Sequence, residues 1–266
     1  MGTSKRNDGP KISLVPGWAD EPVPAAVDSN VPPPIPPRAP DVVGSGVFQP
    51  SRRAMTGYGS SGSRGSLQNA VRRYARDGVG GPRRAARRMG ASRSSAARLL
   101  GFVRDAVRDG ADAALRRLNL PGMAGRSAED VLTVLVDFIC PPGGPLDEAI
   151  ARQGMLQAIG DLAQAGLPFD ALTPDQLQEV FIDFIARTIE GRIYNDIAAG
   201  ALELAQDVTA INDAQDIMHG FILGEVRGAV SEGLVGLEAL TDQALSGTVD
   251  TIYTAAFTVL ASLAEV

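Results

Sequence analysis

The stretch from residue 172 to residue 197 reads LTPDQLQEVFIDFIARTIEGRIYNDI and contains the clearest helix signal in the chain. Thr173 suits the N-cap, Pro174 the first helical position, and Gln176 the third position of a capping box. The apolar residues that follow form two stripes: Leu177, Val180, Phe181, Phe184, Ile185 and Thr188 in the first, and Ile182, Ile189 and Ile193 in the second. A helix with two apolar stripes needs neighbours on two sides, so we expect it to be central in a bundle.

Helical patterns continue on both sides of this stretch. The expected ranges are 92–118, 127–140, 145–165, 208–230 and 241–264, and the basic segments 66–78 and 82–89 precede them. Ser127 is the expected cap of the second range, with Asp130 three residues later. No segment shows sustained alternation of apolar and polar residues, which a strand would require. We therefore predict an all-α fold, an irregular helical bundle of about six helices.

Residues 1–64 differ from the rest in composition. They are rich in Pro, Gly and Ser and have no apolar helical period, which predicts a long extended N-terminal arm. Within it lies a small apolar cluster that holds the chain's single tryptophan: Leu14, Val15, Pro16 and Trp18. This cluster is either a partner-binding anchor or a chance aromatic in a disordered segment.

Charge is sorted along the chain. Residues 65–126 hold 14 Arg and 4 Asp, whereas residues 127–266 hold 4 Arg and 22 acidic residues. We divide the chain into the arm (1–64), a basic helical region (65–126) and an acidic α-helical bundle (127–266), with 65–266 as one folded unit. The nearest anionic surface for the basic region is the acidic half of the same chain, so we expect the two to pack partly together.

The exposed remainder of the basic region is expected to form a docking face. Its candidate residues are Arg72, Arg73, Arg76, Arg83, Arg84, Arg87 and Arg88. The pairs Arg83/Arg87 and Arg84/Arg88 place like charges at i,i+4, which costs roughly 0.2–0.5 kcal/mol each in an isolated helix, so an anionic group should face them. The alternative partner is nucleic acid, with the Arg-rich block 72–98 holding the phosphate backbone. Only Tyr74 and Phe102 in the basic region could stack on bases, which favours a protein partner.

Residues suited to catalysis are scarce. The chain has no P-loop and no G-x-S-x-G turn, and GYGSSG at residues 57–62 matches G-x-G-x-x-G without the strand and helix that a dinucleotide site needs. His219 follows Asp216 by three residues, but the second Glu-x-x-His motif of a di-iron site is absent, so we interpret it as structural. Cys140 has no base nearby and reads as a buried apolar residue. We predict a non-enzymatic protein without cofactor or bound metal.

Signals for export and membrane insertion are also weak. No apolar run follows the basic residues Lys5, Arg6 and Lys11, and the uncharged stretch 251–264 is too short to cross a bilayer. We therefore expect a cytoplasmic protein that does not bind membranes.

Several segments together resemble the QatB family of the bacterial Qat anti-phage defence system. They are MGTS, SLVPGW, RRAARRMGASRSSAARLLGFVRD, ICPPGGPLDEAIA, the stretch 172–197 and IYTAAF, and the similarity runs nearly from end to end. The resemblance implies a non-enzymatic subunit that acts beside a QatA-type ATPase, a QueC-like enzyme (QatC) and a QatD-type TatD-like nuclease. It also implies that the QueC-like protein is the most direct partner.

Gly2 is small enough for Met1 to be removed, which would leave a free α-amino group. Such a group has a pKa of about 7.7–8.0 and is partly neutral and nucleophilic at physiological pH. A QueC-like enzyme activates a carboxylate with ATP for attack by an amine. We therefore expect the arm to enter the partner, with Gly2 as a possible acceptor of a deazaguanine-type modification; the alternative is that the arm only docks.

Overall fold

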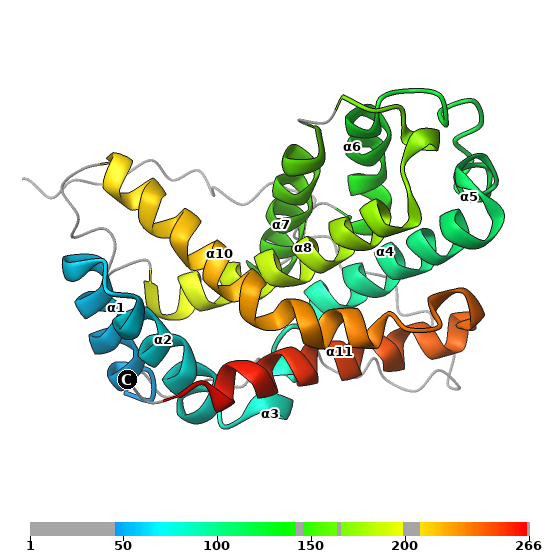
Figure 1. The fold of residues 1–266 in the computed structure, drawn as a ribbon. Helices are drawn as coiled ribbons and strands as arrows, with labels where there is room; N and C mark the ends of the chain where they lie inside the picture. Colours follow the sequence, from blue (N-terminus) through cyan, green and yellow to red (C-terminus); the bar gives the residue numbers. More distant parts are fainter. Residues whose placement is uncertain (1–45, 142–145, 164–165, 199–207, 265–266) are drawn as a thin grey trace, which may run out of the picture. The chain divides into compact units, whose positions relative to one another are not determined.

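The computed structural model describes residues 46–141, 146–163, 166–198 and 208–264, and the described part of the chain is almost entirely helical (Figure 1). Its ten α-helices are α1 (Gln49–Ser61), α2 (Arg64–Arg73), α3 (Pro82–Arg87), α4 (Gly90–Asp109), α5 (Ala111–Arg117), α6 (Ala128–Ile139), α7 (Leu146–Ala163), α8 (Pro174–Ile193), α10 (Val208–Gly233) and α11 (Asp242–Ser262). Two π-helical segments, η2 (Tyr74–Gly78) and η4 (Tyr194–Ala198), continue α2 and α8. These residues contain no strand, so the predicted all-α fold is confirmed.

α8 is the central helix, as the sequence predicts. Its capping box is complete: Gln176 N donates to Thr173 Oγ1 at 3.2 Å, and Thr173 N donates to Gln176 Oε1 at 2.9 Å. α8 packs against α4, α7 and α10, and Figure 1 shows it between α7 and α10. The buried Thr188 hydroxyl also lies 2.7 Å from Tyr253 Oη on α11. Both apolar stripes are thus covered.

The ten α-helices of the described residues exceed the predicted six. α2 and α3 are additional, since no helical stripe was assigned to the basic region before residue 92. The expected helix over 92–118 is broken at Gly110, where φ is 89°, a conformation that residues with a Cβ rarely adopt. This break separates α4 from α5. The fourth additional helix is α1, which lies in the range assigned to the arm.

The predicted arm boundary at residue 64 is wrong, because residues 49–61 form α1. Pro50 lies in the first turn, where backbone N–H groups have no acceptor within the helix, so the lack of an N–H on proline costs no hydrogen bond. Met55 and Tyr58 are buried. Tyr58 Oη donates to the Ala214 carbonyl on α10 at 2.8 Å. The helix is polar outside this narrow stripe and packs mainly against α2, a tertiary contact that was not visible in the composition.

The GYGSSG segment belongs to the same helix. It forms the last turns of α1, and Gly62 ends the helix with φ at 63°. It has no strand before it, so it is not a dinucleotide-binding turn. The rest of the predicted arm, including Gly2, Leu14, Val15, Pro16 and Trp18, lies outside the described residues.

α11 is long and apolar enough to cross a membrane by length and composition, and it is the one such helix among the described residues. It packs against α3, α4 and α10, and its buried side includes Tyr253, Phe257 and Leu260. Burial of this kind is typical of a core helix, so the length of α11 is weak support for a membrane span.

α10 and α11 approach each other closely at Gly233. A Cβ built there would lie 2.3 Å from Ile252 Cγ1 on α11. We expect Gly233→Ala to lower the free energy of unfolding by about 1–3 kcal/mol, because α11 must shift to admit the methyl group. Chemical denaturation measures this difference.

The matched control is Gly228→Ala on the same helix, where a Cβ would meet nothing within 4 Å. This substitution should leave the stability unchanged or raise it by up to about 1 kcal/mol, since Ala is the better helix former. Equal effects at the two positions would contradict the close approach of α10 and α11.

Candidate functional site

The basic region packs against the acidic bundle through ion pairs, as expected from the charge distribution. Arg93 Nε on α4 donates to Asp250 on α11 at 2.6 Å. Asp147 on α7 accepts from Ala91 N at 2.6 Å and from Ser92 Oγ at 3.1 Å. Asp147 therefore caps the N-terminus of α4, which has no side-chain cap of its own. Two larger networks, around Asp196 and around Arg104, complete the contact.

Asp196 is the centre of the first network. Its Oδ2 accepts from Tyr74 Oη at 2.8 Å and from Arg88 Nη2 at 3.3 Å, and Arg192 Nε lies 3.4 Å away. Its backbone carbonyl accepts from Arg52 Nε at 3.1 Å and from Arg52 Nη2 at 2.9 Å. One residue of the acidic bundle thus joins α1, η2 and the end of α3 to α8.

Two π-helical turns place the partners of this network. Tyr74 lies on η2 and Asp196 on η4, each directly after a regular α-helix. Burial first, and then the neighbouring Asp196 carboxylate, raise the pKa of Tyr74, so its hydroxyl stays protonated and donates. This network is not visible in the sequence, because Asp196 is one of 22 acidic residues between 127 and 266 and no local pattern marks a π-turn.

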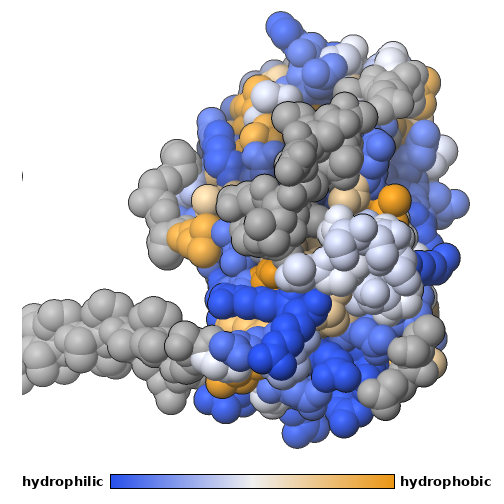
Figure 2. All heavy atoms as spheres, turned by 90° about the vertical axis from the view of Figure 1, so that its left-hand side faces the viewer, coloured by the Kyte–Doolittle hydropathy of each residue, from blue (hydrophilic) through white to orange (hydrophobic). Residues whose placement is uncertain are grey.

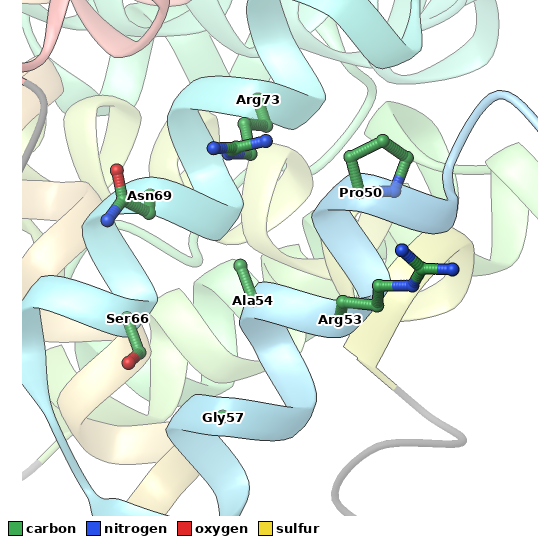
Figure 3. A pocket seen from close by; sticks show the side chains of 7 residues that line it. All are labelled: Pro50, Arg53, Ala54, Gly57, Ser66, Asn69 and Arg73. Atoms are coloured by element: carbon green, nitrogen blue, oxygen red, sulfur yellow. The ribbon is translucent and has the colours of Figure 1, made fainter.

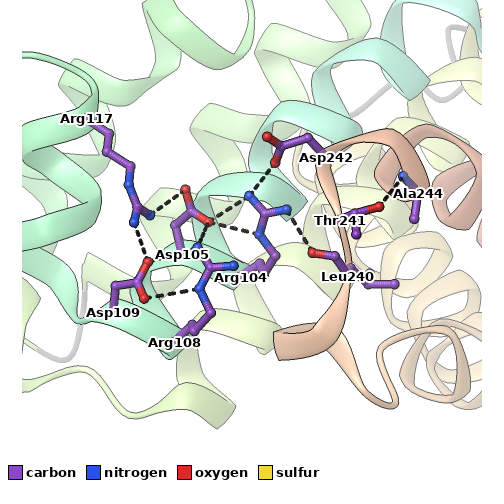
Figure 4. Close-up of polar contacts among 9 residues, drawn as sticks. All are labelled: Arg104, Asp105, Arg108, Asp109, Arg117, Leu240, Thr241, Asp242 and Ala244. Atoms are coloured by element: carbon purple, nitrogen blue, oxygen red, sulfur yellow. Dashed lines mark hydrogen bonds and ion pairs between the residues drawn. The ribbon is translucent and has the colours of Figure 1, made fainter.

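The second network surrounds Arg104 on α4 (Figure 4). Its guanidinium, 6% exposed, lies 2.7 Å from carboxylate oxygens of both Asp105 and Asp242, and it donates to the Leu240 carbonyl at 3.0 Å. A buried guanidinium needs such a set of acceptors to offset its loss of hydration. The network continues to Asp109, where hydrogen bonds from Arg108 and then Arg117 lower the carboxyl pKa to about 2.

Two of the seven arginines predicted for the docking face do not lie on an exposed surface. Arg72 is 4% exposed, and the Arg88 side chain is 15% exposed and turned to Asp196. Both side chains are covered where the basic region packs on the bundle. Arg73 is half-buried, and Arg76 is exposed and paired with Asp77 at 3.2 Å.

The remaining three arginines share one short helix. Arg83, Arg84 and Arg87 are all exposed on α3. None of them makes an ion pair with a residue that the structure describes, and α3 carries no acidic residue. Arg88 at the end of α3 pairs with Asp196, so the expected anionic group is present for this arginine, whereas no described carboxylate pairs with the other three. We call Arg83, Arg84 and Arg87 the α3 face.

His219 is held between two carboxylates of α8. Its Nε2 lies 3.0 Å from Asp183 Oδ1 and its Nδ1 2.9 Å from Glu190 Oε2. Burial alone lowers the pKa of His219, but the hydrogen bonds to Asp183 and Glu190 outweigh it and raise the pKa to about 9. The ring is therefore a cation that donates from both nitrogens at neutral pH and ties α10 to α8. Asp216, its neighbour in sequence, is exposed.

The ligand atoms of Asp161, Asp183 and His219 lie within 4.8 Å of one another, a spacing that a metal ion could bridge. Arg187, however, already stands between the two carboxylates, with Nε 2.8 Å from Asp183 and an ion pair to Asp161. Both nitrogens of His219 are also engaged. The group is a complete ion-pair network, which agrees with a structural role for His219.

Cys140 is also placed as the sequence suggests. Its side chain is 2% exposed at the end of α6, and burial raises the pKa of its thiol. A protonated, enclosed thiol is a poor nucleophile.

Comparison with known families decides the identity of the chain. A family model described as "Qat anti-phage system associated protein QatB" matches residues 80–260. The chain belongs to the QatB family. No curated protein and no solved structure matches it. Membership of the QatB family assigns the chain a role in the Qat anti-phage system, in which the family is described as an associated protein.

The part of the chain matched to QatB runs from just before α3 to α11 and includes the α3 face and the Arg104 network. α1 and α2 precede it. Between them lies a cavity of about 560 Å³ whose polar lining residues are Arg53, Ser66, Asn69 and Arg73 (Figure 3). Figure 2 shows hydrophilic side chains over much of the lower part of the face on this side of the molecule. This cavity therefore lies outside the residues that define the family.

The His219 network predicts a pH-dependent stability. Because the folded state raises the pKa from 6.5 to about 9, the contribution of the charged ring is complete below pH 6.5 and is lost as the pH rises through 9. The stability advantage of the wild type over His219→Gln should therefore be about 3 kcal/mol larger at about pH 6 than at about pH 10. Denaturant unfolding at the two pH values measures it.

Asp216→Asn is the control, since it removes the exposed carboxylate one helical turn from His219. Its effect should be small and nearly the same at both pH values. A wild-type advantage over His219→Gln that does not depend on pH would mean that folding leaves the pKa of His219 unchanged, which would contradict its charged pairing with Asp183 and Glu190.

Proposed function

We propose that this QatB-family chain is a non-catalytic subunit of the Qat system that binds a QueC-like partner enzyme through the α3 face. The observation that carries the proposal is that some arginines of the basic region are buried or paired within the folded unit and others are not. Arg72, Arg88, Arg93 and Arg104 turn to or pair within the folded unit, whereas Arg83, Arg84 and Arg87 stay exposed without an ion pair to a described residue.

Electrostatics supports a docking role for these three residues. Three positive charges within the six residues of α3 repel one another, and a carboxylate-bearing surface would relieve this repulsion. Exposed charges of this kind raise the rate of association with an oppositely charged partner more than they slow dissociation. The α3 face would therefore act mainly by steering the partner.

The polar groups of the described residues support a non-catalytic subunit. A nucleophile needs an adjacent base, and a general base needs a free nitrogen or oxygen. Both nitrogens of His219 are engaged with carboxylates, and the Cys140 thiol is enclosed. Neither residue is thus available to a substrate.

The triple variant Arg83→Ala, Arg84→Ala, Arg87→Ala tests the α3 face. We expect its association rate with the QueC-like partner to fall about tenfold at low ionic strength and much less at high salt, because screening already weakens the attraction there. Biolayer interferometry with the full-length chain measures both rates.

A control triple removes the same charge at arginines that are about as exposed but paired: Arg108→Ala, Arg116→Ala, Arg227→Ala. Their partners are Asp109, Asp112 and Glu179. A similar fall in the association rate for both triple variants would mean that net charge alone causes the effect, and it would contradict a specific binding face. Affinity of the isolated chain for DNA or RNA that falls steeply with salt, and that alanines at Arg83, Arg84, Arg87 and Arg88 abolish, would instead favour a nucleic-acid-binding adaptor.

We further propose that residues before α1 enter the partner and that Gly2, after removal of Met1, accepts a deazaguanine-type acyl group on its α-amine. Support comes from the small second residue and from the ordinary pKa of an α-amino group, about 7.7–8.0, which leaves part of it neutral. Amide formation would join the amine nitrogen to the activated carbonyl carbon and release the activating group and a proton.

Intact-mass spectrometry of the chain co-expressed with its partner tests this modification. We expect an added mass that maps to the N-terminal peptide. Gly2→Leu, in which a bulky second residue keeps Met1 in place, should lack that mass while still binding through the α3 face. An unmodified Gly2 under conditions in which the partner turns over would contradict the acceptor role.

A further inference from the structure

A groove of about 540 Å³ lies between α4, α5, α6 and the first turns of α11. Its volume falls within the range of about 300–1,000 Å³ that is typical of ligand pockets. Much of its lining is apolar, with Phe102, Leu118, Phe138 and Leu245 as the largest side chains. Phe138 is 45% exposed, although its neighbour Ile139 on α6 is buried. An exposed aromatic side chain beside an apolar groove is a common mark of a binding surface.

The charges around the groove are not balanced. Three guanidinium groups line it, from Arg98, Arg104 and Arg117. Arg104 lies against Asp105 and Asp242, and Arg117 against Asp105 and Asp109, as Figure 4 shows. Arg98 pairs with no carboxylate among the described residues. The groove therefore carries one uncompensated positive charge.

Arg98 is fixed in position despite this lack of a counter-ion. Its Nη1 donates to the Ile139 carbonyl at 3.1 Å, which satisfies a terminal carbonyl of α6. This bond holds the guanidinium at the end of α6, and Arg98 and Phe138 both line the groove. A pre-positioned guanidinium pays less side-chain entropy when it binds a carboxylate, and its remaining N–H groups allow a bidentate pair.

We propose that this groove binds a segment of a partner protein in which a bulky apolar side chain lies next to a carboxylate. The apolar side chain would cover Phe138 and the groove floor, and the carboxylate would pair with Arg98. This inference rests on the proposed function as a binding subunit and adds a second contact, since α4, α5, α6 and α11 form the groove and α3 does not.

The family comparison favours this groove over the cavity between α1 and α2. Every residue that lines the groove falls between Ser94 and Ser246, inside the range 80–260 that matches the QatB family. The cavity between α1 and α2 is lined by residues from Pro50 to Arg73, outside that range. A contact that serves the family role is expected within the matched part of the chain.

Two dyes of nearly the same shape test the chemistry of the groove on the full-length chain. Anilinonaphthalene sulfonate joins an apolar aromatic system to an anion, and phenylnaphthylamine lacks the anion. We expect Phe138→Ser to weaken the binding of both dyes, and Arg98→Gln to weaken the sulfonate about tenfold while leaving the neutral dye unchanged. Equal binding of the sulfonate by wild type and Arg98→Gln would overturn the carboxylate pairing.

The controls are Val134→Ser, a half-exposed apolar residue of α6 that does not line the groove, and Arg87→Gln on the α3 face. Neither should change the binding of either dye. If Val134→Ser weakens both dyes as much as Phe138→Ser does, the dyes report general exposure of apolar surface and the proposal fails.

Phe138→Ser, Arg98→Gln and Val134→Ser are then compared with the wild type for affinity to the partner enzyme. We expect Phe138→Ser and Arg98→Gln each to weaken the complex about tenfold and Val134→Ser to leave it unchanged. If Phe138→Ser and Arg98→Gln lose dye binding but keep their affinity for the partner, the groove is not a docking site. Docking through the α3 face would be unaffected by that result. A wild-type chain that binds the dyes but not the partner would instead overturn the proposed function.

A second copy of the chain is the remaining occupant to test. A concentration-dependent dimer of the wild type that Phe138→Ser converts to a monomer, seen by light scattering, would replace the partner segment with self-association and overturn the proposal.

Discussion

Ten of the twenty residues of α8 are buried, and they lie on two faces of the helix. Each large apolar side chain removed from water contributes about 1.5–3 kcal/mol, so neither face can be left open. α4, α7 and α10 supply the neighbours, and α11 adds the hydrogen bond between Tyr253 and Thr188. The other elements take their places around this helix. The turn that follows it, η4, presents Asp196 to the basic region.

Charge then decides how the basic region lies on this core. Asp147 and Asp242 accept hydrogen bonds from donors on α4. Asp196 accepts from Tyr74 on η2 and from Arg88 at the end of α3. The pairing is incomplete, and several exposed arginines have no carboxylate partner among the described residues. Three of them form the α3 face, and Arg98 in the groove is another. Several arginines of the basic region pair with carboxylates of the folded unit, whereas the α3 face and Arg98 pair with none among the described residues, and the proposed partner contacts rest on this difference.

Local sequence signals predicted the elements that depend on local chemistry. The capping box at Thr173, the serine cap at Ser127 and the apolar stripes of α8 all occur as expected, because each needs only residues within a few positions of one another. The failures have equally physical causes. α1 was missed because its narrow apolar stripe is buried only by tertiary packing, mainly against α2. The range 92–118 was predicted as one helix because its apolar stripe continues past Gly110, where the backbone turns at positive φ.

The sequence by itself determined the helical class, the central helix, the sorting of charge and the family to which the chain belongs. Only the tertiary structure decided which charged groups are free. The sequence places Asp216 three residues before His219, yet the ring lies between Asp183 and Glu190 on another helix. Arg72 and Arg88 belong to the same basic region as the α3 face, but both side chains turn inward. Spacing along one helix fixes which side chains share its face, whereas the partner of a charge is set by the helix packed against it, and that packing joins residues more than 100 positions apart, as in Arg88 and Asp196.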